Sequence, residues 1–160
     1  MASYNVSHLA ILYQKDPVQF LNTLRYDMLT LAGMIIRCPL MTQNKIKDTK
    51  GGTHSLIAFQ REVIPLVTAV RKIVSEMGDR ISNNQPINHS YVRYFYKRLT
   101  AIIDRIDRIY ASTDIKIERE IISLMGHNDF FNYYKMPVER MKQLLKVFSK
   151  AITLNETGFR

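Results

Sequence analysis

Four long stretches of this chain place apolar residues at every third or fourth position. Such spacing puts the apolar side chains on one side of an α-helix. The positions are Leu21, Leu24, Met28, Leu31 and Ile35; Leu56, Phe59, Val63, Leu66, Val70, Ile73 and Met77; Val92, Phe95, Leu99, Ile102, Ile106 and Ile109; and Val138, Met141, Leu145, Phe148 and Ile152. Because these stripes must be buried against one another, the pattern predicts an all-α bundle of five or six helices.

Local signals predict the boundaries of the first two helices. Residues 5–14 carry a short apolar pattern that is typical of a helix. Asp16 can cap the free amides of the next helix, and Pro17 suits its first position. That helix stops near Arg37, because the residue before Pro39 is pushed out of the helical region.

The third helix is expected to follow a long basic loop. Residues 39–53 lose the apolar periodicity, and a loop of this length is either mobile or binds something. The helix begins near 53–55 and ends at Gly78. Pro65 lies inside it and predicts either a kink or a break between two helices.

The second half of the chain shows comparable signals. Asn88 or Ser90 can cap a helix over 89–111. A polar interruption follows, then a restart that Gly126 ends, and Met136 with Pro137 opens the last helix. Residues 155–160 are expected to fray. With no repeat and no shift in composition, residues 1–160 form a single helical domain, and the width of the stripes favours a globular bundle over an extended coiled coil.

Composition narrows the class of protein. The 160 residues contain 23 Lys and Arg against 14 Asp and Glu, a formal charge of +9 that favours acidic or polyanionic partners. The single cysteine, Cys38, excludes an internal disulfide and indicates a reducing compartment. With no signal-peptide pattern and no apolar run long enough to span a membrane, a cytoplasmic protein is expected.

Two basic regions are candidates for binding a partner. The run Arg93-Tyr94-Phe95-Tyr96-Lys97-Arg98 alternates cations with aromatic rings, as sites for single-stranded nucleic acid do. Phe95 and Tyr96, however, belong to or border the apolar stripe. In the last helix, Lys142, Lys146 and Lys150 follow one another at every fourth position and can meet a phosphate backbone, an anionic surface or an acidic protein. An ordinary solvated helix face explains the same row.

The basic loop has no nucleotide-binding motif. Lys45, Lys47 and Lys50 precede two glycines, but the Gly-Lys-Ser/Thr pattern is missing and no strand comes before them. Nor do the four histidines fall in a metal-binding or catalytic pattern, and no Glu-x-x-His motif occurs. We therefore expect no catalytic residues, no metal and no cofactor.

The function that fits these observations is that of a non-enzymatic regulator that binds a larger, acidic partner. In size, charge and general character, though not in any motif, the chain is similar to phage and plasmid proteins that inhibit or redirect a host enzyme. The expected partner-binding residues are Lys45, Lys47, Lys50, Arg93, Tyr94, Lys97, Arg98, Lys142, Lys146 and Lys150. One alternative is a nucleic-acid-binding module that uses the basic and aromatic helix faces. Another is a self-assembling subunit, such as a homodimer, that buries Phe130, Phe131, Tyr133 and Tyr134.

Overall fold

The computed structural model describes residues 4–37, 53–112, 119, 122–123, 126–129, 132 and 135–157, without the side chains of 53–60, 129 and 157. The longer helices in these ranges are α1 (Val6–Lys15), α2 (Pro17–Arg37), α4 (Thr53–Ser82), α5 (His89–Ala111) and α8 (Met136–Thr157). A three-residue turn, α7 (His127–Asp129), lies between the last two. The predicted all-α bundle with five helices is confirmed.

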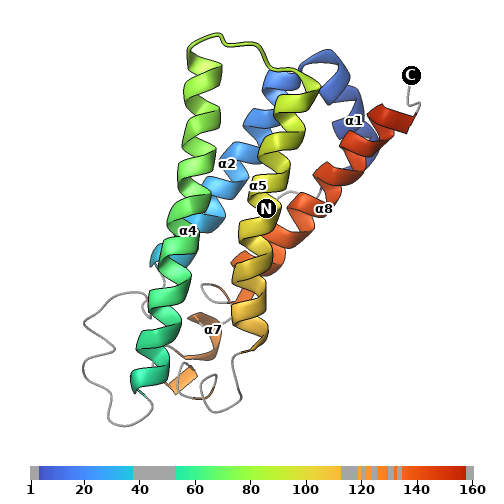
Figure 1. Cartoon of the computed structure of the whole chain (residues 1–160). Coiled ribbons are helices and arrows are strands. Elements are labelled where there is room, and N and C mark those ends of the chain that lie inside the picture. The colour runs from blue at the N-terminus through green and yellow to red at the C-terminus, as the bar shows by residue number, and fades with distance from the viewer. Residues whose placement is uncertain are drawn as a thin grey trace.

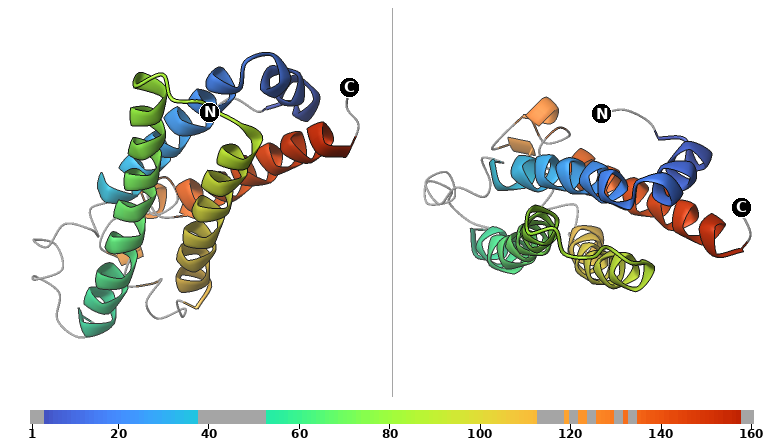
Figure 2. Two further views of the ribbon diagram at one scale, coloured as in Figure 1. Left: turned by 45° about the horizontal axis from the view of Figure 1, so that its top comes forward. Right: turned by 90° about the horizontal axis from the view of Figure 1, so that it is seen from above.

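Four of the helices form an antiparallel ring. Helix α2 packs against α4, α4 against α5, α5 against α8, and α8 against α2 (Figure 1). Each helix of the ring is antiparallel to both of its neighbours, and α1 packs across α2 and α8. Seen from above, α4 and α5 make one layer and α2 and α8 the other (Figure 2).

The predicted stripes form the core where their side chains are described. Phe20, Met28 and Phe148 are among the fully buried side chains at its centre. In α5 the buried positions are Val92, Phe95, Leu99, Ile103 and Ile106. The expectation that Ile102 and Ile109 are central is therefore wrong, since both are only half-buried. The side chains of Leu56 and Phe59 lie outside the described part of the chain.

The first helix boundaries follow the local signals. The Asn5 side chain caps α1 by accepting from the amides of Ser7 and His8. Asp16 closes α1 through its own amide, which donates to the carbonyl of Leu12 at 2.7 Å. The same residue opens α2, because its carboxylate accepts from the Gln19 amide at 3.1 Å. A single residue thus joins two helices.

Helix α4 runs past the predicted stop at Gly78 and ends four residues later, at Ser82. Its end is a Schellman motif: Asn84 has a left-handed φ of 54°, the Gln85 amide donates to the Arg80 carbonyl, and the Asn84 amide donates to the Ile81 carbonyl. Pro65 is inside one continuous helix, at an exposed position. The proposed break at this proline is therefore wrong.

The remaining boundaries agree with the sequence except at the C-terminal end. The side chain of Asn88 caps α5 by accepting from the Tyr91 amide at 2.8 Å. Gly126, with φ of 81°, ends a helical turn. The tail expected at 155–160 is instead helical through Thr157, and Asn155 donates to the carbonyl of Ala10 at 3.1 Å. Residues 39–52 and most of 113–125 lie outside the described part.

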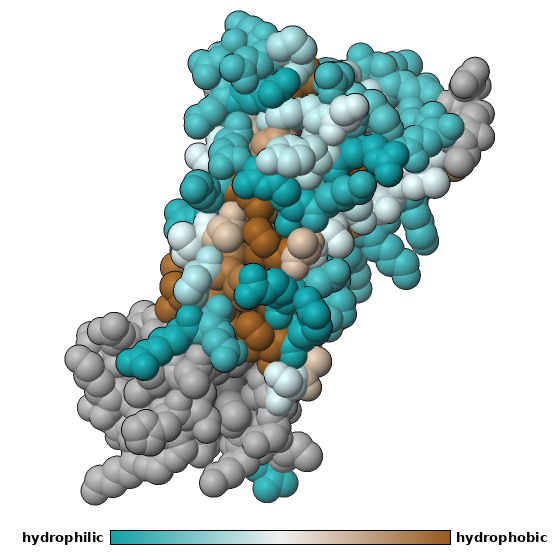
Figure 3. Space-filling model, in the orientation of Figure 1, coloured by the Kyte–Doolittle hydropathy of each residue, from teal (hydrophilic) through white to brown (hydrophobic). Residues whose placement is uncertain are grey.

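On the face of Figure 1, hydrophobic residues form a strip along the lower half of the α4–α5 seam, and hydrophilic residues cover the upper part (Figure 3). Among the described helices, none combines the length and the hydropathy that crossing a membrane requires.

Candidate partner-binding groove between helices α5 and α8

A groove of about 550 Å³ lies between α5 and α8. We call it the α5–α8 groove. Its lining residues are Tyr96, Thr100, Ile103 and Asp104 of α5, and Glu139, Lys142, Gln143, Leu145, Lys146, Ser149 and Lys150 of α8. The predicted lysine row of the last helix therefore lines a groove, and a second helix forms its other wall.

The helix register explains how this lining arises. Lys142, Lys146 and Lys150 are one turn apart, so that they follow the same side of α8. That side borders the buried stripe, because Leu145 lies beside Lys146 in the chain and is only 5% exposed. Together with the fully buried Ile103 of α5, Leu145 gives the groove an apolar floor.

Two ion pairs join the walls of the groove near its ends. Lys142 Nζ lies 3.3 Å from Asp107 Oδ1. Towards the C-terminus of α8, Arg93 Nη1 lies 2.9 Å from Glu156 Oε1. Because all four groups are partly exposed, each pair contributes only about 0–1 kcal/mol to stability. Their larger effect is that Asp107 and Glu156 already have cation partners and do not balance the other lysines.

Between these ion pairs the charges are unbalanced. Lys146 and Lys150 are exposed, and neither has a carboxylate partner in the described part of the chain. Like charges one turn apart repel each other by a few tenths of a kcal/mol, as an order-of-magnitude figure. Asp104 and Glu139, which also line the groove, have no cation partner among the described residues. The groove therefore carries unpaired charges of both signs.

One neutral polar group also faces this site without a partner. Thr100 Oγ1 is buried and makes no hydrogen bond within the described residues. A buried hydroxyl without a partner costs about 1–3 kcal/mol. Because Ile103, Leu145 and this hydroxyl are buried, the groups that the groove offers to a partner are chiefly the exposed ammonium groups of Lys146 and Lys150.

The structure divides the predicted aromatic and cationic run between different sides of α5. Phe95 is buried, Tyr96 lines the α5–α8 groove, and Tyr94 is 54% exposed on the side towards α4. Arg93 forms an ion pair with Glu156, and Arg98 forms one with Glu76. The six residues of the run therefore do not form one surface, because residues adjacent on a helix point in directions about 100° apart.

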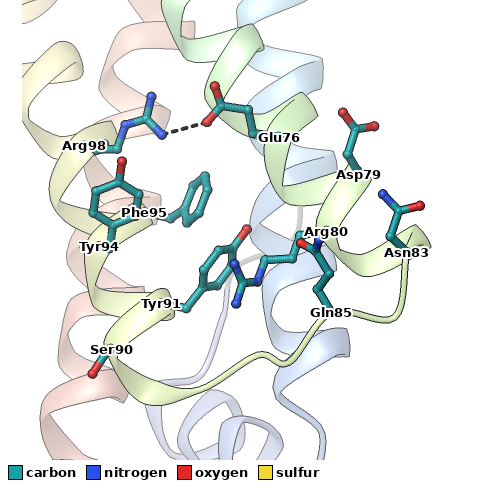
Figure 4. A pocket seen from close by; sticks show the side chains of 10 residues that line it. All are labelled: Glu76, Asp79, Arg80, Asn83, Gln85, Ser90, Tyr91, Tyr94, Phe95 and Arg98. Atoms are coloured by element: carbon teal, nitrogen blue, oxygen red, sulfur yellow. Dashed lines mark hydrogen bonds and ion pairs between the residues drawn. The ribbon is translucent and has the colours of Figure 1, made fainter.

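Tyr94 and Arg98 belong instead to a pocket of about 620 Å³ between α4 and α5 (Figure 4). Arg98 Nη1 donates to Glu76 Oε2 at 2.7 Å, and this hydrogen bond raises the pKa of Arg98. The second arginine, Arg80, lies 3.9 Å from the ring centre of Tyr91 and donates to the Pro86 carbonyl. In this α4–α5 pocket, Glu76 therefore balances the charge of Arg98, whereas Arg80 is held in place by a neutral carbonyl and a ring and has no carboxylate partner in the described part of the chain.

Sequence reasoning missed a hydrogen-bonded chain that joins three helices. The Tyr13 hydroxyl lies 2.5 Å from His89 Nδ1, and His89 Nε2 lies 2.7 Å from Glu156 Oε1. Because a carboxylate only accepts, Nε2 carries a proton, and in the neutral ring Nδ1 accepts from Tyr13. Burial raises the pKa of Tyr13 to about 12, and the charge of Glu156 adds to this effect. The phenol stays protonated at neutral pH, so the chain ties α1, α5 and α8 together. No local motif could have revealed it.

Several predicted residues lie outside the described part of the chain. These are Lys45, Lys47 and Lys50 of the basic loop, Cys38, and the aromatic residues Phe130, Phe131, Tyr133 and Tyr134. Of the expected partner-binding residues, the structure brings Lys142, Lys146 and Lys150 together. Lys97 is exposed one turn from Arg93 and three residues from Thr100, on the neighbouring surface of α5.

The described residues contain no group of three or more His, Cys, Asp or Glu side chains that could hold a metal ion. The chain matches no protein-family model, no curated protein and no solved structure.

Proposed function

We propose that this chain is a non-enzymatic binding protein whose α5–α8 groove docks on an acidic surface of a larger protein and thereby inhibits or redirects that protein. The observation that carries the proposal is the pair of lysines, Lys146 and Lys150, which line the groove without a carboxylate partner in the described part of the chain. Carboxylates from a partner would supply the missing counter-charges.

The net charge of +9 supports the same proposal. A field of this sign speeds the encounter with an acidic partner, and docking then removes water from the lysine heads. Ion pairs that exclude water are stronger than exposed ones. Binding would therefore be fast and sensitive to salt.

A protein partner fits better than a nucleic acid. Arg93 and Arg98 are already paired with carboxylates, and the exposed ring of Tyr94 lies on the α4 side, away from Lys146. Asp104 and Glu139 would repel a phosphate backbone that continued along the groove. A short acidic segment that meets Lys146 and Lys150 does not extend to Glu139, which is two turns from Lys146 in α8.

The test compares binding of three labelled polyanions: a poly-glutamate peptide, single-stranded DNA and single-stranded RNA of matched length. Fluorescence anisotropy is measured at low and high salt for the wild type, for K146E/K150E and for R71E/K72E. The last variant makes the same charge change at exposed positions of α4, outside the groove. We expect poly-glutamate to bind at low salt, with affinity lost in K146E/K150E and retained in R71E/K72E.

Two outcomes would overturn the proposal. If K146E/K150E binds poly-glutamate as the wild type does, the groove is not the acidic-partner site. If DNA or RNA binds more tightly than poly-glutamate and needs the same two lysines, the chain is a nucleic-acid-binding module instead.

A further inference from the structure

We propose that Lys142 is a third lysine of the acidic-partner site and that Asp107 is an internal competitor, which pairs with Lys142 until a carboxylate of the partner displaces it. This inference rests on the proposed function and adds a regulating residue to the same groove. Lys142 begins the row that Lys146 and Lys150 continue, and all three line the groove. The other two have no carboxylate partner in the described part of the chain, whereas Lys142 Nζ lies 3.3 Å from Asp107 Oδ1.

The ion pair between Lys142 and Asp107 is open to solvent. The lysine side chain is 40% exposed and the aspartate side chain is 33% exposed. A buried pair is costly to break because it leaves a charge in the protein without a counter-charge. Here both groups would remain in contact with water, and exposed pairs of this kind contribute little to stability. A carboxylate of a partner can therefore take the place of Asp107 at Lys142.

The ion pair at the other end of the groove is held more firmly. Glu156 Oε1 accepts from Arg93 Nη1 at 2.9 Å and also from His89 Nε2 at 2.7 Å. If the contact with Arg93 opened, His89 would still hold the carboxylate in place. Asp107 has no second contact of this kind in the described part of the chain, because its carboxylate pairs with Lys142 alone. Of the two carboxylates, Asp107 is therefore the one that a partner can displace.

Displacement of Asp107 lengthens the cationic surface of the groove. Lys146 and Lys150 are one turn apart, a rise of about 6 Å, whereas the row from Lys142 to Lys150 rises about 12 Å along α8. The row ends there, because Glu139 lies about one turn beyond Lys142. An acidic segment that follows the whole row must replace a contact that the fold already makes. Asp107 thus lowers the affinity for such a segment.

The experiment uses the full chain and poly-glutamate at low salt. Fluorescence anisotropy gives the affinity of the wild type, D107N, K142M and the double variant D107N/K142M. The matched control is D79N, which makes the same change of charge at an exposed aspartate of α4, outside the groove. Circular dichroism checks that each variant is folded.

We expect D107N to bind poly-glutamate about two- to fivefold more tightly than the wild type, because one exposed cation is freed. D79N should bind as the wild type does. In the K142M background, most of the gain from D107N should disappear, because the cation for which Asp107 competes is missing.

Two results would overturn the inference. If D107N binds as the wild type does, Asp107 does not compete with the partner. If D107N improves binding equally with and without the Lys142 charge, the aspartate acts only through the overall field of the groove and Lys142 is not a contact. In both cases, loss of poly-glutamate binding in K146E/K150E would leave the proposed function standing, so that the two failures are distinguishable.

Discussion

The guanidinium group of Arg25 lies directly over Gly78. A Cβ atom added to Gly78 would be 2.8 Å from Arg25 Nε and 2.9 Å from both Cζ and Nη2, closer than van der Waals contact allows. The missing side chain therefore lets a residue of α2 cross the backbone of α4, at a buried glycine about one turn before the end of the helix.

A double-mutant cycle at Arg25 and Gly78 tests this relationship. Alanine is favoured over glycine inside a helix by about 1 kcal/mol. We expect G78A in the R25A background to raise the free energy of unfolding by about that amount, because the crossing group is gone. In the wild type, G78A displaces Arg25 and the gain disappears, which gives a coupling of about 1–2 kcal/mol. Urea denaturation of the four proteins measures it, and additive effects would contradict the contact.

Gly78 also illustrates where sequence reasoning succeeds and where it does not. The starts at Asp16 and Asn88 were predictable, because each capping side chain bonds to an amide three residues away. A glycine inside a helix gives the same local signal as a glycine just after its end. Only the contact with Arg25, which comes from another helix, distinguishes the two.

In the candidate site, too, features within one helix were predictable, and contacts between helices were not. The lysine row at Lys142, Lys146 and Lys150 was predictable, because it depends on the register of one helix. The pairing of Arg93 with Glu156, which are 63 residues apart, depends on how α5 and α8 pack. The sequence alone could not show that Arg93 has a carboxylate partner, whereas Lys146 has none in the described part of the chain.

Asn84 gives a second prediction, at the end of α4. Its left-handed φ of 54° costs an ordinary L-residue roughly 1–2 kcal/mol, asparagine less and glycine nothing. We expect N84A to lower the free energy of unfolding by about 1 kcal/mol and N84G to raise it slightly. Thermal and urea denaturation measure both. The control is N83A, one residue earlier at an exposed position outside the left-handed region. If N84G is less stable than N84A, the Schellman geometry is incorrect.

The buried Tyr13 and the partly buried Tyr4 predict how stability depends on alkaline pH. Burial raises the pKa of Tyr13 to about 12, with a further contribution from Glu156. Burial also raises the pKa of Tyr4 to about 12, with its hydrogen bond to Asp27 adding to the effect. Because the folded protein disfavours the phenolate, the stabilisation is complete below pH 10, the ordinary pKa, and is lost as the pH rises towards 12.

We therefore expect the free energy of unfolding to fall between pH 10 and pH 12, and the double variant Y4F/Y13F to lose much of that dependence. Urea denaturation followed by circular dichroism at each pH measures the slope. Y26F replaces an exposed tyrosine as the control and should keep the slope of the wild type. The same slope in Y4F/Y13F as in the wild type would contradict the burial of both phenols.

The Thr100 side chain lowers the stability of the fold relative to an apolar side chain of the same shape. Its hydroxyl is buried and has no hydrogen-bond partner in the described part of the chain. Valine has almost the same shape and no polar group. We expect T100V to raise the free energy of unfolding by about 1 kcal/mol. T68V, at an exposed position of α4, should change it by less than about 0.5 kcal/mol. Destabilisation by T100V would mean that the hydroxyl has a partner.

Substitutions of Lys146 are expected to change stability and binding in opposite directions. In K146E the new glutamate stands one turn from both Lys142 and Lys150, so that a repulsive row becomes two attractive pairs. Each such pair contributes about 0.2–0.5 kcal/mol, and the repulsion is removed as well. We expect K146E to be more stable than the wild type at low salt, and the difference to shrink at high salt as screening increases.

K146Q separates the two contributions, because it removes the repulsion without adding a pair, and it should lie between the wild type and K146E. Binding of poly-glutamate should follow the opposite order, strongest in the wild type and weakest in K146E, since each step removes positive charge from the groove. Stability and affinity measured on the same three proteins therefore test whether the lysine row exists for a partner. If K146E is less stable than the wild type, Lys146 has a carboxylate partner within the fold and is not free to bind one from outside.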